Sequence, residues 1–90
     1  MGYVIVKIKI MPVSVETDIE KIKKRVVQIL KKNGNNNHKF EIQPIAFGLK
    51  ALILLFSWPE EKSLDHFENE LKDIQGVSSI EILDMRREIG

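Results

Sequence analysis

The most apolar segment of the chain covers residues 49–56, in which Lys50 is the only charged residue among leucine, isoleucine, alanine and phenylalanine. A run of this length and composition is typical of a β-strand that is buried on both faces. Phe47 and Gly48 come directly before it. Because glycine adopts backbone conformations that other residues avoid, Gly48 allows the chain to turn sharply or to approach a partner closely. The segment therefore predicts a buried strand that is entered through a turn.

Three further segments have strand character. Apolar residues alternate with mostly polar ones in each of them, which indicates strands with one face toward a core. Pro12 ends the first strand and Pro44 interrupts the second, because proline has no amide proton to donate to a neighbouring strand. Pro44 therefore also suggests that the second strand lies at a sheet edge. The four predicted strands cover residues 4–10, 38–43, 49–57 and 77–85.

Two helices are predicted between these strands. Thr17 and Glu20 have the spacing of a capping box, so we expect Thr17 to be the N-cap of the first helix. Ser63 is the expected N-cap of the second. Gly34 and Gly76 follow the helices at positions where left-handed C-caps are common. Apolar residues recur every three or four positions in both helices: Ile19, Ile22, Val26, Ile29 and Leu30 in the first, and Leu64, Phe67, Leu71 and Ile74 in the second.

The order of elements is β-α-β-β-α-β, which predicts a single α+β domain over residues 1–90 with the ferredoxin-like fold. Right-handed crossovers place both helices on one face of a four-stranded antiparallel sheet, with the first and third strands in the centre. The Asn-rich stretch at residues 33–37 is expected to be a plain connector, with a flexible contact loop as the alternative.

Composition excludes several kinds of function. The 90 residues include no cysteine, so disulfides, thiolate metal sites and cysteine nucleophiles are excluded. His38 and His66 stand alone, and no serine has a base at motif spacing, so we expect no metal, no cofactor and no covalent catalysis. Trp58 is expected to cap the core rather than to bind a partner. No stretch approaches the roughly 20 apolar residues of a membrane span, and Met1 leads straight into a strand pattern, so we expect no signal peptide and a cytoplasmic location.

A series of motifs resembles the archaeal elongation factor 1-beta family. Its signature is Pro-Ile-Ala-Phe-Gly-Leu-Lys-Ala-Leu at residues 44–52. Supporting motifs are Ile-Lys-Ile-Met-Pro at 8–12, Thr-Asp-Ile-Glu-Lys-Ile-Lys at 17–23, Ile-Gln-Gly-Val-Ser-Ser-Ile-Glu at 74–81 and Asp-Met-Arg-Arg-Glu-Ile-Gly at 84–90. Relatives usually carry a longer acidic turn where this chain has residues 57–62, and the Asn run is unusual.

The resemblance implies an exchange factor that promotes replacement of GDP by GTP on elongation factor 1-alpha. Such a protein makes no bonds and is not an enzyme. The family suggests that a basic group near the C-terminus disturbs the Mg²⁺ and nucleotide site, for which we expect Arg87 first, then Arg86, with Lys50 third. Phe47 and Gly48 are the candidates for docking on the GTPase. The alternative for Phe47 is a core residue at the entry to the strand.

A small RNA- or ribosome-binding domain of the same fold is the alternative function. Lys7, Lys9 and the basic first helix motivate it. However, the net charge of the chain is only +1, from 14 basic and 13 acidic residues, and a general nucleic-acid binder is expected to be more basic. Base-stacking aromatic residues are also scarce on the predicted central strands. We therefore expect the basic helix face to be merely solvated, and no direct nucleic-acid partner or membrane partner.

Overall fold

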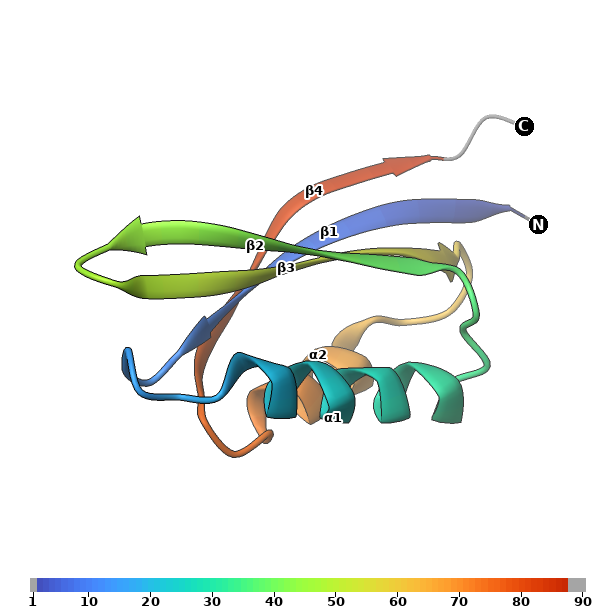
Figure 1. Cartoon of the computed structure of the whole chain (residues 1–90). Coiled ribbons are helices and arrows are strands. Elements are labelled where there is room, and N and C mark those ends of the chain that lie inside the picture. The colour runs from blue at the N-terminus through green and yellow to red at the C-terminus, as the bar shows by residue number, and fades with distance from the viewer. Residues whose placement is uncertain (1, 88–90) are drawn as a thin grey trace.

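The computed structural model describes residues 2–87 and contains one antiparallel sheet with two helices on a single face (Figure 1). The sheet order is β2-β3-β1-β4, so β1 and β3 are central and β2 lies at an edge. This confirms the predicted ferredoxin-like fold. In chain order the elements are β1 (Tyr3–Pro12), α1 (Ile19–Lys32), β2 (His38–Ala46), β3 (Leu49–Pro59), α2 (Asp65–Lys72) and β4 (Val77–Arg87).

The central strand β3 is buried on both faces in its middle, although helices cover only one face. Leu52 and Leu54 point toward the helices and are fully buried, while Ala51 and Ile53 are buried on the opposite, open face. The register places Lys9 and Glu41 on either side of Ile53. The aliphatic stems of such long side chains cover apolar surface while their charged ends stay in water. The prediction of two buried faces is thus confirmed for residues 51–54.

Aromatic rings close the core where β3 meets α2. The ring of Phe67 lies 5.1 Å from that of Phe56 and 5.0 Å from that of Trp58, measured between centroids. Trp58 is 2% exposed, and its indole Nε1 donates a hydrogen bond to the carbonyl of Lys62. This arrangement satisfies both requirements of a buried tryptophan, apolar contact and a partner for its N–H. The prediction that Trp58 belongs to the core is confirmed.

The predicted capping box at the start of α1 is wrong by one residue. Asp18, not Thr17, is the N-cap, and its Oδ1 accepts a hydrogen bond from the amide of Glu20 at 3.0 Å. Thr17 instead accepts from the amide of Ser14 at 3.2 Å and closes the preceding turn. Both residue types cap helices well, so the sequence alone could not decide between neighbours. At the other end, Gly34 follows the helix with a φ of 77°, as expected for a helix terminus.

Helix α2 is shorter than predicted. It begins at Asp65 and its N-cap position is Leu64, so Ser63 is not the N-cap, although its Oγ accepts from the amide of Asp65 at 3.2 Å. The helix ends at Lys72, and Ile74 lies in the following turn while still contributing to the core. Because Ile74 is buried without being helical, the apolar periodicity predicted a helix that was too long.

All four strands run further than predicted, and β1 covers Tyr3–Pro12 instead of residues 4–10. β2 continues through Pro44 to Ala46, β3 reaches Pro59, and β4 reaches Arg87. Pro44 is tolerated within β2 because that strand lies at the sheet edge, and the register shifts just after it. The pairing of β4 with β1 also shifts its register, between Lys7 and Ile8 of β1. One extra residue there returns Met85 to the same side of the sheet as Ile82, so the predicted simple alternation ends at this bulge.

An ion pair joins the two helices and makes the free energy of unfolding depend on pH. Lys32 Nζ lies 2.7 Å from Glu70 Oε2, and this hydrogen bond is the main reason that the pKa of Glu70 lies below its ordinary value of 4.5. Because the folded pKa is lowered, the stabilisation is present above the unfolded pKa and is lost as the pH falls through the folded pKa. Lys32 is largely exposed, so the contribution is below about 1 kcal/mol.

We therefore expect Lys32→Gln to lower the free energy of unfolding at neutral pH by less than about 1 kcal/mol. The difference from the unmodified protein should disappear under acidic conditions, where Glu70 is protonated. Urea unfolding at several pH values measures this. Lys31→Gln is the matched control, since Lys31 is exposed and has no ion pair among residues 2–87. An equal pH dependence in both variants would contradict the role of the pair.

Candidate functional site

A two-residue turn at Phe47 and Gly48 connects β2 to β3. Ala46 pairs with Leu49 across it, and both turn residues have positive φ angles, 52° for Phe47 and 82° for Gly48. Tight hairpins prefer this geometry because it matches the twist of the strands, and they usually fill it with Asn-Gly or Gly-Gly. Glycine suits the second position. A bulky phenylalanine at positive φ is strained, so the conformation of the turn does not account for Phe47.

Phe47 is also completely exposed, at 101% of its reference area. The alternative interpretation of Phe47 as a core residue is therefore wrong. Phe47 lies in the turn of the β2–β3 hairpin. This hairpin extends past the end of β1 (Figure 1). Other exposed apolar side chains come from the β2–β3 hairpin and from the loop between β1 and α1, namely Val13, Val15, Ile42 and Ile45. Together with Phe47 they make up what we term the hairpin end.

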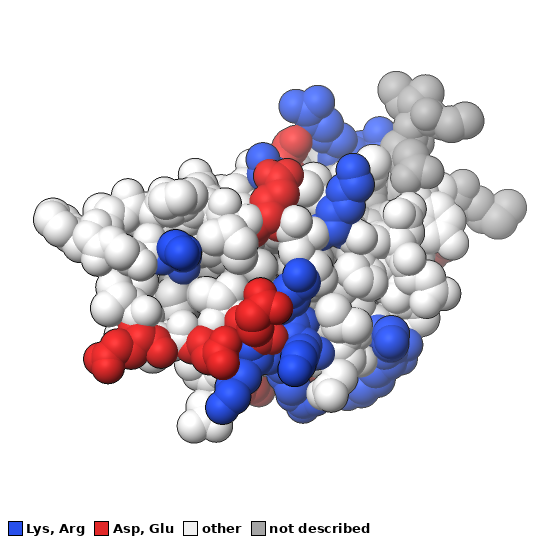
Figure 2. Space-filling model, in the orientation of Figure 1, with Lys and Arg blue, Asp and Glu red and all other residues white. Residues whose placement is uncertain are grey.

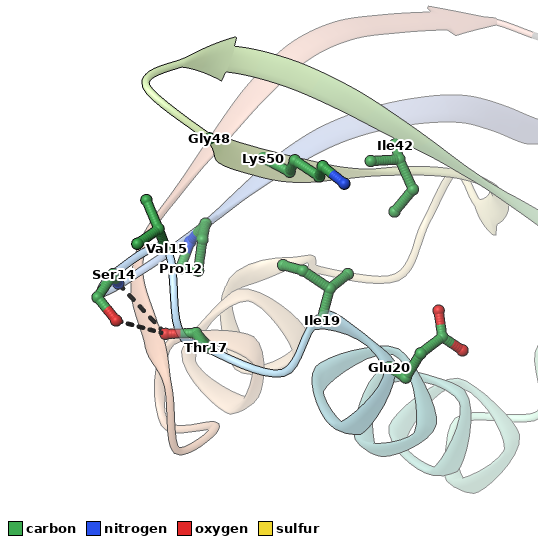
Figure 3. Close-up of a pocket in the computed structure, with 9 residues that line it drawn as sticks. All are labelled: Pro12, Ser14, Val15, Thr17, Ile19, Glu20, Ile42, Gly48 and Lys50. Carbon is green, nitrogen blue, oxygen red and sulfur yellow. Dashed lines mark hydrogen bonds between the residues drawn. The ribbon is translucent and has the colours of Figure 1, made fainter.

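A cleft of about 300 Å³ opens beneath the hairpin at this end of the molecule (Figure 3). Ile19 and Ile42 face each other across it, and the side chain of Lys50 runs along its upper wall beneath β3. The floor is ordered by Ser14, whose amide and hydroxyl both lie within hydrogen-bond distance of Thr17 Oγ1. The residues that line the cleft are Pro12, Ser14, Val15, Thr17, Ile19, Glu20, Ile42, Gly48 and Lys50.

The two candidate arginines point to opposite faces of the sheet. Arg86 pairs in register with Ile5 on the open face, and its Nε lies 2.8 Å from Asp84 Oδ2. Arg87 pairs with Val4, whose side chain packs against the core, and its guanidinium forms an ion pair with Glu60. Both guanidinium-bearing side chains are largely exposed, 81% for Arg86 and 73% for Arg87. Arg86 is therefore accessible from the open face of the sheet, and Arg87 is accessible from the helix side.

The candidate residues divide between the two ends of the molecule. Lys50 lies two residues beyond Leu52, which pairs with Ile10, whereas Arg87 pairs with Val4. Eight residues of strand thus separate Lys50 from Arg87, or roughly 26 Å. The molecule is elongated, with a longest extent of 42 Å. Phe47, Gly48 and Lys50 are brought together, and the arginines are not placed with them.

Comparison with known proteins identifies the family. The model of the EF-1 guanine nucleotide exchange domain matches residues 5–87. The chain belongs to this exchange-domain family. An elongation factor 1-beta from Methanothermobacter thermautotrophicus is 40% identical over 88 residues, covering 97% of this chain and 98% of that protein. Proteins of the same name from Archaeoglobus fulgidus and Metallosphaera sedula are 38% and 40% identical and cover 94% and 97% of the chain.

Sequence reasoning missed one residue of this exchange domain, which lies beside Arg87 at the end of β4. Glu60, in the segment after β3, pairs with Arg87, which lies 27 positions later in the chain. Its amide also donates to the carbonyl of Gly2 at 2.8 Å, so it ties β1 and β4 together at their ends. No local motif marks such a contact, because it depends on which strands are neighbours. The contact follows only when both β3 and β4 are known to pair with β1.

The open face of the sheet does not resemble an RNA-binding face. Lys7 lies in register with Asp84 and Lys9 with Glu81, so an acidic residue lies beside each of the two strand cations that, together with the basic first helix, motivated the RNA hypothesis. Among the described residues, Tyr3 is the one aromatic residue in register with this face, since Phe40, Phe56 and Trp58 belong to the helix side. Within residues 2–87 no helix is long and apolar enough to cross a membrane.

Proposed function

We propose that this protein promotes exchange of GDP for GTP on elongation factor 1-alpha during translation elongation. The observation that carries the proposal is the match of the exchange-domain family over residues 5–87, together with relatives that align over nearly their whole length. The protein acts by binding alone and makes or breaks no covalent bond. This role places it in the cytoplasm, with the GTPase as its partner.

Exchange requires that the factor bind the nucleotide-free GTPase better than the loaded form. Weakening nucleotide binding a thousandfold needs about 4 kcal/mol of coupling between the two binding events. A cation brought to about 4 Å from another unit charge, at an effective dielectric near 20, supplies a repulsion of about 4 kcal/mol. One well-placed basic side chain near Mg²⁺ therefore has the required magnitude.

Arg87 is the proposed cation. It lies at the end of β4, its guanidinium is largely exposed, and Glu60 holds it on the helix side of the sheet. An exposed ion pair of this kind is worth at most about 1 kcal/mol, so the GTPase site can draw Arg87 away at small cost. Arg86 faces the other way and is paired with Asp84 of its own strand. Lys50 lies at the other end of the molecule, so it cannot reach the nucleotide site together with Arg87. This supports a single cation at that site.

The hairpin end is the proposed docking surface. Phe47 is strained and fully exposed, and a side chain kept under those conditions is best explained by burial in a partner. Lys50 lies about 26 Å from Arg87 along the sheet. We therefore assign Lys50 to docking, at the rim of the cleft beside Phe47, and not to the nucleotide site. The two surfaces together span the long axis of the molecule.

Release of labelled GDP from a purified archaeal elongation factor 1-alpha tests the proposal. The protein should accelerate release by several orders of magnitude at saturation, and raising the Mg²⁺ concentration should oppose it, since a cation acts against Mg²⁺ binding. A small GTPase that is not a translation factor is the control partner. Unchanged release from elongation factor 1-alpha would contradict the proposed function.

A further inference from the structure

Positive charge is concentrated on α1, a feature that the exchange function does not use. The helix carries six basic residues and one acidic residue, a net charge of +5, whereas the whole chain has a net charge of +1. The remainder of the chain is therefore acidic by four charges. In Figure 2 lysine and arginine side chains lie along the lower part of the face shown, where α1 runs in Figure 1, and acidic side chains lie beside them toward the left.

Three lysines on this helix are free to bind an anion. Lys23 lies over the ring of Phe40, Arg25 donates to Gln28, and Lys32 pairs with Glu70. The remaining cations, Lys21, Lys24 and Lys31, are exposed and have no ion pair or side-chain hydrogen bond within residues 2–87. Their spacing of three and seven residues keeps them on one side of the helix. They form a stripe about 15 Å long, which we term the lysine stripe.

An amide-lined hollow continues from the C-terminal end of α1. Its volume is about 480 Å³, and it is lined by Tyr3, the Asn-rich loop and the end of β3. Asn35 is buried and fixes the loop, since its Nδ2 donates to the carbonyl of Ser57 and its Oδ1 accepts from the amide of Asn37. The side chains of Asn36 and Asn37 remain exposed.

The hollow also has an aromatic wall and a nearby cation. Tyr3 is 51% exposed, which leaves ring surface accessible. Lys62 Nζ lies 3.4 Å from the carbonyl of Asn33 at the rim and 4.7 Å from the centroid of the Trp58 ring, so this cation already has partners. Amides that can hydrogen-bond, an accessible aromatic ring and the lysine stripe nearby are the groups that recognise an unpaired nucleobase and its phosphates.

We propose that the lysine stripe and this hollow form a binding site for single-stranded RNA. The stripe contacts phosphates, and the hollow takes one unstacked base between Tyr3 and the Asn-rich loop. A duplex keeps its bases stacked and paired, so it could use the stripe but not the hollow. The site uses none of the residues assigned to nucleotide exchange, and it does not depend on the proposed function. It also differs from the sheet-face interpretation, because Lys7 and Lys9 take no part.

Fluorescence anisotropy with a short labelled oligoadenylate tests the proposal, over a range of salt from about 50 to about 200 mM. Replacing Lys21, Lys24 and Lys31 together with glutamine should weaken binding about 30-fold and make the salt dependence shallower, by about 0.7 per lost phosphate contact. The same variant should release GDP from elongation factor 1-alpha as fast as the unmodified protein. That result separates the RNA site from the exchange surfaces.

The matched control replaces Lys7, Lys9 and Lys39 with glutamine, which removes the same charge from the open face of the sheet. It should weaken binding only a fewfold, through general electrostatics. An equal loss in both triple variants, or no binding of RNA at the lowest salt, would overturn the proposal. Binding of polyglutamate as tight as that of RNA would also overturn it, since the stripe would then be a surface for acidic proteins.

Tyr3→Leu tests the hollow apart from the stripe. Loss of base stacking should weaken oligoadenylate about tenfold, while affinity for duplex RNA of the same length should not change. Because Tyr3 is half exposed, this substitution leaves the core intact, and the circular dichroism spectrum verifies the fold. Equal affinity of the unmodified protein for duplex and single strand, or an unchanged affinity in Tyr3→Leu, would rule out the base-binding hollow.

Discussion

Replacing Arg87 with alanine is expected to slow the maximal rate of GDP release about 100-fold while leaving the concentration for half-maximal exchange nearly unchanged. Removing a cation close to Mg²⁺ deletes up to about 4 kcal/mol of repulsion. Solvent and Glu60 screen part of this, so we expect a loss of about 2–3 kcal/mol, which corresponds to roughly 100-fold in rate. Single-turnover release of labelled GDP at increasing concentrations of the factor separates the two quantities.

Two matched variants make this prediction specific. Arg87→Lys keeps the charge and should retain most of the activity. Arg86→Ala removes a neighbouring cation from the opposite face of the sheet and should change the rate less than about threefold, since Arg86 is paired with Asp84. All three variants should unfold at nearly the same temperature, because both arginines are exposed. A larger loss in Arg86→Ala than in Arg87→Ala would transfer the role to Arg86.

Replacing Phe47 with asparagine is expected to raise the concentration for half-maximal exchange about 50-fold without lowering the maximal rate. Burial of a phenylalanine side chain in a partner is worth about 1.5–3 kcal/mol, and a loss in the middle of this range corresponds to this factor. The substitution is chosen because Asn-Gly is a favoured pair for this type of turn. The variant should therefore be at least as stable as the unmodified protein.

The control for this prediction is Leu83→Ala on β4. Leu83 is an exposed apolar residue that lies away from the hairpin, so its loss should not weaken docking. Titration of the factor against labelled GDP release, with thermal unfolding in parallel, measures both effects. A Phe47→Asn variant that exchanges nucleotide normally would show that Phe47 does not dock, and its strained conformation would then need another explanation.

Most of the fold could be predicted because the decisive signals are local. Alternation of apolar residues in β1 and the continuous apolar run of β3 mark the two central strands, and the chain order determines how they connect. The errors lie at element ends. Asp18 replaced Thr17 as N-cap, and Ile74 lay outside α2 although it is buried. These choices differ by small energies, and tertiary packing decides them.

The candidate site was only partly predictable. The motif around Phe47 and the arginines at the end of the chain are visible in the sequence, and they indicated the family. The sequence allows Phe47 to lie in the core or on the surface, since an apolar residue beside a buried strand fits either place. The positive φ angles of the turn and the full exposure of the ring decide this point.

By itself the sequence determined the order of elements, the buried faces and the family, because these follow from periodicity and from short motifs. Only the tertiary structure decided how the charged residues are distributed. A bulge in β4 places Arg86 and Arg87 relative to β1, Glu60 meets Arg87 across 27 positions, and Lys7 and Lys9 lie in register with Asp84 and Glu81. The physical reason is that electrostatic interactions depend on distances between side chains far apart in the chain, whereas hydrophobic patterning is written along it.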